Sequence, residues 1–319
     1  MKKYNEKELI QLGEKVQDFI DRYHDIEREI EIVELIEQRF AHKFGQNNPI
    51  LTRSGTDSFL GILWSLGLKD DDEVILPVSI CQSMVNSVMI ANAVPTLVDV
   101  EEDLSISLQS LLRHINKKTK VIVFFHPYGL ACDVRPIKRI IQQCKHKIYL
   151  IEDCVQSIGT QFNHNPIGQL GDFAIYSFGK QKPVSVGMGG IVCVNNTQFY
   201  DKIKMYLRTG VFGIADDRVA GLNSTMSFLD MVLLYKTLQA YERIVEQKIR
   251  KAKIYIEQLQ DVGTFIGLKN KQAENLFHRV VLSTSPKSGK NYQRIISEIQ
   301  NELKETVPDI VQSTIPIPL

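Results

Sequence analysis

The sequence predicts an α/β fold with a mostly parallel seven-stranded sheet and helices on both faces. Short apolar runs alternate along the chain with segments of helical periodicity, which is the pattern of strand–helix–strand units. Most of these runs are apolar at successive positions, as expected for strands that are covered on both sides. The candidate strands are Ile50–Arg53, Glu73–Pro77, Thr96–Val100, Lys120–His126, Lys147–Glu152, Phe173–Phe178 and Ile191–Asn195.

Helical segments connect these strands and precede them. The connecting candidates are residues 56–67, 82–93, 107–115 and 134–145, and a longer helix follows at 197–208. Before the first strand, residues 5–42 place apolar side chains three and four positions apart, which predicts an amphipathic helix with a break near His24. Its apolar face packs either on the body of the protein or on a partner subunit.

The C-terminal part predicts a smaller unit. We expect a loop at 209–225, a helix at 227–260, short strands at Thr264–Leu268 and His278–Leu282, and a helix at Tyr292–Lys304. This mixture is typical of a small, shortened α+β domain. The expected boundaries are an N-terminal helical segment at 1–45, a large α/β domain at 46–238 and a small C-terminal domain at 239–319.

The composition excludes several classes of protein. The 319 residues carry 38 Lys and Arg against 37 Asp and Glu, and this near-neutral balance argues against binding to nucleic acids or membrane surfaces. We expect no signal peptide, because the basic N-terminus has no apolar core of the required length, and no membrane span, because no apolar run reaches about 18 residues. The five cysteines have neither metal-binding nor disulfide-framework spacing, which predicts a reducing, cytoplasmic setting, and the scattered histidines predict no metal site.

A turn with anion-binding chemistry follows the first strand. Ser54, Gly55 and Thr56 open a helix, where unpaired backbone N–H groups and the helix dipole attract anions. Gly55 allows a ligand to approach the backbone closely. The alternative is an ordinary helix cap, for which this turn is also well suited.

An aspartate closes a later strand. Asp153 follows a buried apolar run, and an acid at that depth needs a cationic partner or takes up a proton. The pyridinium nitrogen of pyridoxal phosphate is such a partner, and Gln156 lies within reach of the phenolic oxygen of the same ring. In the alternative interpretation, Asp153 caps the helical turn at 154–158 and Gln156 is a polar loop residue.

A lysine stands just past another buried strand, in the segment SFGKQKPVSVGMGG at Ser177–Gly190. A partly desolvated lysine loses its proton more easily and can form a Schiff base with an aldehyde, which makes Lys182 the candidate nucleophile. Ser177 is a candidate for binding a phosphate. Lys180 competes for the same role, and a surface lysine in a glycine-rich loop is the remaining alternative.

Two further features near the strand ends carry less information. Gly187, Gly189 and Gly190 precede a strand instead of opening a helix, so they do not form a dinucleotide-binding fingerprint. His126 ends another strand, where it either lines the site or is a satisfied core histidine.

Seven motifs, taken in order, resemble those of the DegT–DnrJ–StrS family of nucleotide-sugar aminotransferases. They are SGTDSFLGILWSLGL, DDEVILPVSICQSMVNSV, ANAVPTLVDVEEDLSI, KVIVFFHPYGLACDV, IEDCVQSIG, GDFAIYSFGKQK and GMGGIV. The resemblance runs from about Glu34 to Lys253. It implies a fold-type I pyridoxal-phosphate transferase that forms a homodimer with shared active sites.

The resemblance also implies a role for the lysine and its neighbours. The family's Ser–Phe pair lies five and four residues before its aldimine-forming lysine, and Gly-x-Gly-Gly begins five residues after it; Lys182 fits this spacing and Lys180 does not. Asp153 matches the partner of the pyridinium nitrogen, and Gln156 matches the residue near the phenolic oxygen.

Other matched positions concern the phosphate of the cofactor. Gly55, Thr56 and Ser177 match phosphate-binding residues of the family. The segment GLNSTMS at 221–227 resembles a loop whose asparagine, here Asn223, reaches the phosphate in the neighbouring subunit.

Three positions depart from the common family pattern. Cys81 stands where many members place an aromatic ring against the cofactor, which is typical of a subgroup with the form SFG-x-x-KP. Thr225 replaces the usual arginine of the dimer loop. The C-terminal region is short and has no recognisable version of the family's late substrate-facing segment.

The resemblance implies an enzyme that transfers an amino group from an amino acid, glutamate or glutamine, to a keto-sugar that is linked to a nucleotide. One alternative is a non-catalytic or regulatory protein that binds pyridoxal phosphate. Another is a related sugar dehydratase, in which a histidine replaces the lysine; Lys182 argues against it.

Overall fold

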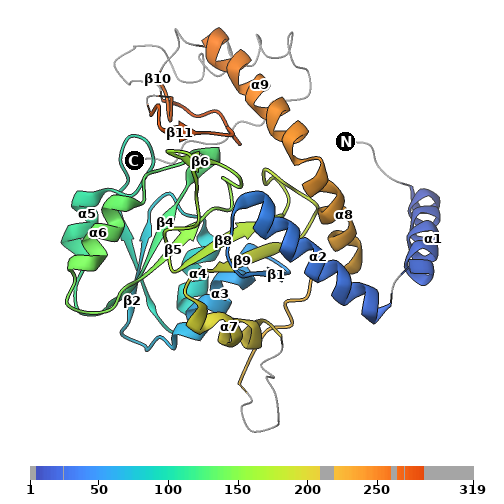
Figure 1. The fold of residues 1–319 in the computed structure, drawn as a ribbon, viewed down its shortest axis with the longest axis horizontal. Helices are drawn as coiled ribbons and strands as arrows, with labels where there is room; N and C mark the ends of the chain where they lie inside the picture. Colours follow the sequence, from blue (N-terminus) through green and yellow to red (C-terminus); the bar gives the residue numbers. More distant parts are fainter. Residues whose placement is uncertain (1–4, 24, 209–218, 260–263, 269, 284–319) are drawn as a thin grey trace.

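A seven-stranded sheet forms the centre of the molecule in the computed structural model, which describes residues 5–23, 25–208, 219–259, 264–268 and 270–283 (Figure 1). The strand order is β1-β9-β8-β5-β4-β2-β3. Their bounds are β1 Pro49–Thr52, β2 Glu73–Pro77, β3 Val94–Val98, β4 Thr119–Phe125, β5 Tyr149–Asp153, β8 Phe173–Ser177 and β9 Gly190–Val194. Only β9 pairs antiparallel to its neighbours, so the predicted, mostly parallel seven-stranded sheet is confirmed.

Helices cover both faces of this sheet. They are α2 Ile26–Phe44, α3 Gly55–Leu66, α4 Gln82–Ile90, α5 Leu108–His114, α6 Arg135–Gln143, α7 Tyr200–Leu207 and α8 Phe228–Gln239. Alternate residues of one strand face opposite sides: Val121 and Val123 belong to the core under α3, α4 and α7, whereas Ile122 and Phe124 belong to the core under α5 and α6. This two-sided burial explains why the strands are apolar at successive positions.

The N-terminal helical segment consists of two helices. Helix α1 spans Glu6–Tyr23, and α2 begins at Ile26 after the cap residue Asp25, whose side chain accepts a hydrogen bond from the Arg28 N–H at 2.8 Å. The break predicted near His24 is therefore confirmed. Figure 1 shows α1 standing apart from the body, where the Phe19 ring lies 6.1 Å from that of Phe228.

The predicted helix at 227–260 is also divided, because α8 ends at Gln239 and α9 spans Tyr241–Leu259. Further strands are short: β6 Gln161–Phe162 and β7 Asn165–Pro166 lie between β5 and β8, whereas β10 Thr264–Phe265, β11 Ala273–Glu274 and β12 Leu282–Ser283 follow α9. Strand β11 pairs with β6, so the chain after α9 returns to the segment between β5 and β8.

Two predictions for the C-terminal part differ from the structure or fall outside it. The strand predicted at His278–Leu282 is wrong for most of its length, because only Leu282 belongs to a strand. The helix predicted at Tyr292–Lys304 lies outside the described residues, as do residues 209–218 of the predicted loop. Within the described ranges, no helix combines the length and the apolar content needed to cross a membrane.

Candidate active site

The polar residues singled out in the sequence meet at one edge of the sheet. Strand β1 is antiparallel to β9, and β9 is antiparallel to β8, so β1 runs in the same direction as β8, β5 and β4. The residues that end these strands or follow them directly, Ser54, His126, Asp153 and Ser177, therefore share the carboxyl edge. In sheets of this kind, ligands bind at that edge.

The start of α3 lies directly against the end of β8. The Ser54 hydroxyl caps the helix by accepting a hydrogen bond from the Asp57 N–H at 3.0 Å. A Cβ atom on Gly55 would lie 3.1 Å from that of Ser177, and one on Gly190 would lie 2.4 Å from the carbonyl carbon of Ser54. Glycine at these positions lets β8, β9 and the first turn of α3 approach one another, with the N–H groups of this turn at the carboxyl edge.

The loop at 221–227 is tied to the same turn of α3. The Ser224 hydroxyl donates to Asp57 Oδ2 at 2.8 Å, and the Ser224 carbonyl oxygen accepts from the Arg53 N–H at 2.9 Å. Asn223 is exposed beside this anchor. Whether it reaches the site of a neighbouring subunit stays a prediction.

Asp153 is the buried acid of the site. It ends β5 with 1% of its surface exposed, and its Oδ1 accepts a hydrogen bond from the Val155 N–H at 3.1 Å. Burial raises the pKa of this carboxyl group to about 6, while the Val155 N–H, the Lys182 charge and His126 act in the opposite direction. A carboxylate here is therefore short of positive charge, which a cationic ligand would supply.

The two candidate lysines have different surroundings. Lys182 is half-buried, and its charge acts on both Asp153 and His278, whereas Lys180 is exposed. Between them, Gln181 adopts a left-handed backbone conformation with a φ of 67°, which is unusual for a residue with a side chain. These surroundings favour Lys182 over Lys180, as the motif spacing does.

Gln156 and Cys81 occupy loops at the carboxyl edge. Gln156 Oε1 accepts a hydrogen bond from the Tyr128 N–H at 2.9 Å, which fixes the side chain against the loop after β4. Cys81 is exposed at the start of α4, where its Sγ lies 2.9 Å from the Ser83 hydroxyl.

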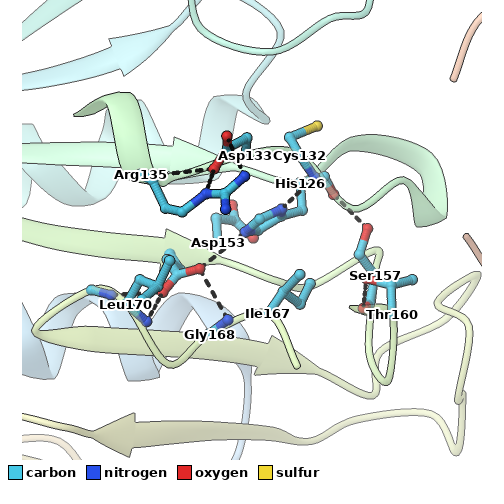
Figure 2. A network of polar contacts seen from close by, with 12 residues as sticks. His126, Cys132, Asp133, Arg135, Asp153, Ser157, Thr160, Ile167, Gly168 and Leu170 are labelled. Atoms are coloured by element: carbon cyan, nitrogen blue, oxygen red, sulfur yellow. Dashed lines mark hydrogen bonds and ion pairs between the residues drawn. The ribbon is translucent and has the colours of Figure 1, made fainter. Parts of the chain in front are cut away.

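His126 belongs to a buried network behind Asp153, which Figure 2 shows from close by. Its Nδ1 accepts from the Cys132 N–H at 3.2 Å, so its Nε2 carries the proton that is donated to Glu152 at 3.2 Å. Glu152 also accepts hydrogen bonds from the N–H groups of Gly168, Leu170 and Gly171. Of the two interpretations, the satisfied core histidine describes His126.

The same network includes a possible ligand set for a metal ion. The ligand atoms of His126, Glu152 and Cys154 all lie within 4.8 Å of one another. Hydrogen bonds already occupy both imidazole nitrogens and both carboxylate oxygens, and burial raises the pKa of the Cys154 thiol well above its usual value. Because metals bind the thiolate form, this cluster is a structural network and not a suitable metal centre.

The sequence provided no signal for one part of the site. Residues after β11 return to the loop that follows β4: the Leu276 N–H donates to the Gly129 carbonyl oxygen at 3.0 Å, and the Arg279 N–H donates to that of Tyr128 at 3.2 Å. This places His278 near Lys182. A C-terminal segment therefore reaches the site, although no family motif was recognisable in it.

These surroundings fit pyridoxal phosphate. The buried Asp153 suits a pyridinium nitrogen, the half-buried Lys182 suits an aldehyde carbon, and the N–H groups at the start of α3 suit a phosphate. Two polar atoms that have no hydrogen-bond partner in the described part of the chain, Ser79 Oγ and His278 Nδ1, are also buried near the carboxyl edge.

Comparison with known proteins identifies the family. The sequence profile of the DegT/DnrJ/EryC1/StrS aminotransferase family matches residues 23–310. The chain belongs to this family. Both the family and the aminotransferase class that the sequence predicted are thus confirmed. All of helix α1 except its last residue, Tyr23, lies before the matched region.

Curated members of this family are similar to the chain over most of its length. A GDP-perosamine synthase of Vibrio cholerae is 29% identical over 257 residues, which are 79% of this chain and 68% of that protein. The UDP-N-acetyl-3-dehydro-alpha-D-glucosamine 3-aminotransferase of Acidithiobacillus ferrooxidans is 29% identical over 254 residues, covering 77% and 67% of the two chains.

Solved structures share the fold at lower identity. A family aminotransferase from Brucella abortus has a TM-score of 0.76 at 23% identity and covers 85% of this chain and 73% of its own. NtdA of Bacillus subtilis, solved with the cofactor PMP, has a TM-score of 0.73 at 24% identity, with coverages of 86% and 62%. A GDP-4-keto-6-deoxymannose-3-dehydratase with bound GDP-perosamine has a TM-score of 0.75 at 20% identity, with coverages of 85% and 76%. The predicted fold-type I architecture is confirmed, and it accommodates both transfer and dehydration.

Proposed function

We propose that this member of the aminotransferase family uses pyridoxal phosphate to transfer an amino group from an amino acid to a nucleotide-linked keto-sugar. The observation that carries the proposal is the position of Lys182, which is half-buried and whose charge acts on the buried Asp153. A lysine for the aldehyde and an acid for the ring nitrogen thus lie at one edge of the sheet.

Each residue of the site has a distinct part in this proposal. Lys182 Nζ would hold the aldehyde carbon of the cofactor and, as general base and then general acid, would move a proton from the donor's Cα to that carbon. Asp153 keeps the ring nitrogen protonated. The cofactor, when bound, supplies an electron-withdrawing ring and stores the amino group between the two substrates.

Further side chains orient the cofactor. Gln156, which the Tyr128 N–H holds in place, would bind the phenolic oxygen of the cofactor, and Cys81 would lie against its ring. Gly55, Thr56 and Ser177 would bind the phosphate, because Gly55 and Thr56 begin α3 and Ser177 lies directly against them. The exposed Asn223 completes the phosphate site of a second copy of the chain, which makes the enzyme a homodimer.

The substrate class follows from two relatives. One is named for a product linked to GDP and the other for a substrate linked to UDP, and both compounds are amino or keto sugars. The feature common to the two is a sugar attached to a nucleoside diphosphate. We therefore assign the substrate to the nucleoside-diphosphate sugars and leave the identity of the nucleobase unassigned. Glutamate is the proposed donor. The cysteines are all unpaired, which fits a reducing cytoplasm.

Dehydration is the competing reaction, because a dehydratase has the same fold. Lys182 favours transfer, since the related dehydratases carry a histidine there. A non-catalytic protein that only binds the cofactor is the other alternative.

The decisive experiment follows the two halves of the reaction separately. Glutamate is expected to bleach the absorbance of the bound cofactor, and a nucleotide-linked keto-sugar is expected to restore it, with the Lys180→Ala variant behaving as wild type. If glutamate leaves the spectrum unchanged, the protein is not a transaminase with this donor. If the sugar returns dehydrated and without nitrogen, the competing reaction is correct.

A further inference from the structure

A group of cations lies beside Lys182 without a matching acid. The charges of Lys248, Arg279 and Lys182 all act on the imidazole of His278. Lys248 comes from α9, whereas His278 and Arg279 come from the segment after β11; Figure 1 shows α9 and β11 on the same side of the molecule. In the described part of the chain, no ion pair joins any of these side chains to a carboxylate.

The surroundings of His278 indicate a missing partner. Its Nδ1 is buried and has no hydrogen-bond partner within the described ranges. Burial, followed by the three neighbouring cations, lowers the pKa of this imidazole to about 3, so it is neutral at physiological pH. Its one N–H bonds the backbone of Gln181, which leaves the unpartnered Nδ1 as a hydrogen-bond acceptor. Buried polar atoms in native proteins almost always have a partner, and a ligand is one way to supply it.

Lys248, like His278, has surroundings that disfavour its positive charge. It is half-buried, and burial, together with the nearby Lys251, lowers the pKa of its ammonium group. Three like charges around the buried imidazole repel one another, and an anion placed among them would relieve that repulsion.

The backbone fixes this group relative to the cofactor site. Two hydrogen bonds join Leu276 and Arg279 to the loop at Tyr128 and Gly129, and a Cβ atom on Gly129 would lie 2.3 Å from the His278 nitrogen. The same loop supplies the N–H that holds Gln156. His278 and Arg279 therefore border the cofactor residues but are not among them.

We propose that Lys248 and Arg279, beside His278, bind an oxyanion group of a substrate and thereby orient its reacting carbon at Lys182. The inference rests on the proposed function, in which both substrates carry such groups: the diphosphate of the nucleotide-linked sugar and the carboxylates of the amino donor. A guanidinium group binds either anion with two parallel hydrogen bonds, and the ammonium group adds a further donor. The His278 Nδ1 would accept a hydrogen bond from a hydroxyl or amino group, and the two substrates carry such groups as well.

The test measures equilibrium binding of two probe anions to the enzyme loaded with its cofactor. Inorganic pyrophosphate represents the diphosphate, and glutarate represents the donor's carboxylates. Lys248→Gln and Arg279→Gln each remove one charge from the group. Arg250→Gln is the matched control, because Arg250 lies on α9 as well but is exposed. Circular dichroism and the cofactor spectrum verify that each variant is folded and loaded.

We expect Lys248→Gln and Arg279→Gln to weaken binding of one probe by about 10-fold to 100-fold, the range for loss of a charge-assisted hydrogen bond, and Arg250→Gln to change it less than about twofold. The KM of the corresponding substrate is expected to rise with the dissociation constant, while kcat changes little. Weaker pyrophosphate binding alone assigns the site to the sugar's diphosphate, and weaker glutarate binding alone assigns it to the donor.

Unchanged binding of both anions in the two folded variants would overturn the inference. Because binding is measured without turnover, this result is independent of the proposed function. If the wild-type enzyme binds an anion through these residues but transfers no amino group, the anion site stands and the aminotransferase proposal fails.

Discussion

The two adjacent acids at the end of β5, Glu152 and Asp153, have pKa values that are shifted in opposite directions. Asp153 accepts one backbone hydrogen bond, and burial raises the pKa of its carboxyl group to about 6. Glu152 accepts hydrogen bonds from His126 and from three backbone N–H groups, and together these outweigh burial and lower the pKa of its carboxyl group. Successive residues of a strand point to opposite faces, so one acid can complete the core while the other faces the site.

The first prediction concerns the protein without its cofactor. The pKa of Asp153 is about 6 in the folded state and 3.8 in a free chain, so the folded state binds this proton more tightly. Protonated Asp153 therefore stabilises the fold fully below pH 3.8, and this contribution is lost as the pH rises through 6. The loss amounts to about 3 kcal/mol in the free energy of unfolding.

The variant Asp153→Asn isolates this effect, because its amide does not titrate. Urea unfolding of the cofactor-free proteins between pH 4 and pH 7 is expected to show wild type losing stability relative to the variant as the pH rises. A stability difference that is flat or changes in the other direction would mean that Asp153 is not the desolvated acid of the site.

Motif spacing was sufficient to choose Lys182 over Lys180, because the choice depends on positions within one short segment. His126 remained ambiguous, since its partner Glu152 lies on another strand. His278 and Lys248 gave no signal at all: their juxtaposition depends on the return of the chain after β11, which no local pattern predicts.

At the scale of elements, close approach of the backbone decides where the first turn of α3 lies. Gly190 begins β9, and a side chain there would overlap the backbone of Ser54 and Gly55. The glycine-rich segment after Lys182 is therefore needed for packing as well as for its conformational freedom. The predicted phosphate site depends on this contact.

The second prediction is that Gly190→Ala displaces the start of α3. A Cβ atom 2.4 Å from the carbonyl carbon of Ser54 forces the backbone apart, which is expected to destabilise the fold by about 1–3 kcal/mol and to weaken cofactor binding at least 10-fold. Thermal unfolding and titration with pyridoxal phosphate measure the two effects.

Gly13→Ala provides the control, since a Cβ atom on Gly13 in α1 would have no atom within 4 Å. Normal cofactor affinity in Gly190→Ala would show that the start of α3 does not hold the phosphate.

The main strands were predicted to within a few residues, because burial on both faces leaves a continuous apolar run. The two-residue strands β6, β7 and β11 were not predicted, since so short a segment has no periodicity. The strand at His278–Leu282 was wrong for most of its length, because the Arg279 N–H bonds the Tyr128 carbonyl oxygen in the loop after β4 and only Leu282 pairs with a strand, β10.

At the scale of the whole molecule, the loop at 221–227 raises the question of shared sites. Ser224 anchors it to the protein's own α3 and β1, and Asn223 remains exposed beside this anchor. Residues that are exposed in one chain but lie next to the site are well placed to serve a second copy.

The third prediction tests this arrangement by mixing two inactive variants. If Asn223 acts in the neighbouring subunit, dimers that pair Lys182→Ala with Asn223→Ala contain one site with both native residues. Transaminase activity is then expected to reappear on mixing, at about one quarter of the wild-type level for random pairing. No gain, with mixed dimers verified by mass spectrometry, would place Asn223 in its own chain's site or outside any site.

The link between Lys182 and pyridoxal phosphate is the central claim, and one labelling measurement tests it directly. The loaded protein is reduced with borohydride, digested, and mapped by mass spectrometry. We predict an absorbance band at the edge of the visible range before reduction and the cofactor's mass attached to the peptide at Lys182 alone. Attachment at Lys180, or no attached cofactor, would contradict the account.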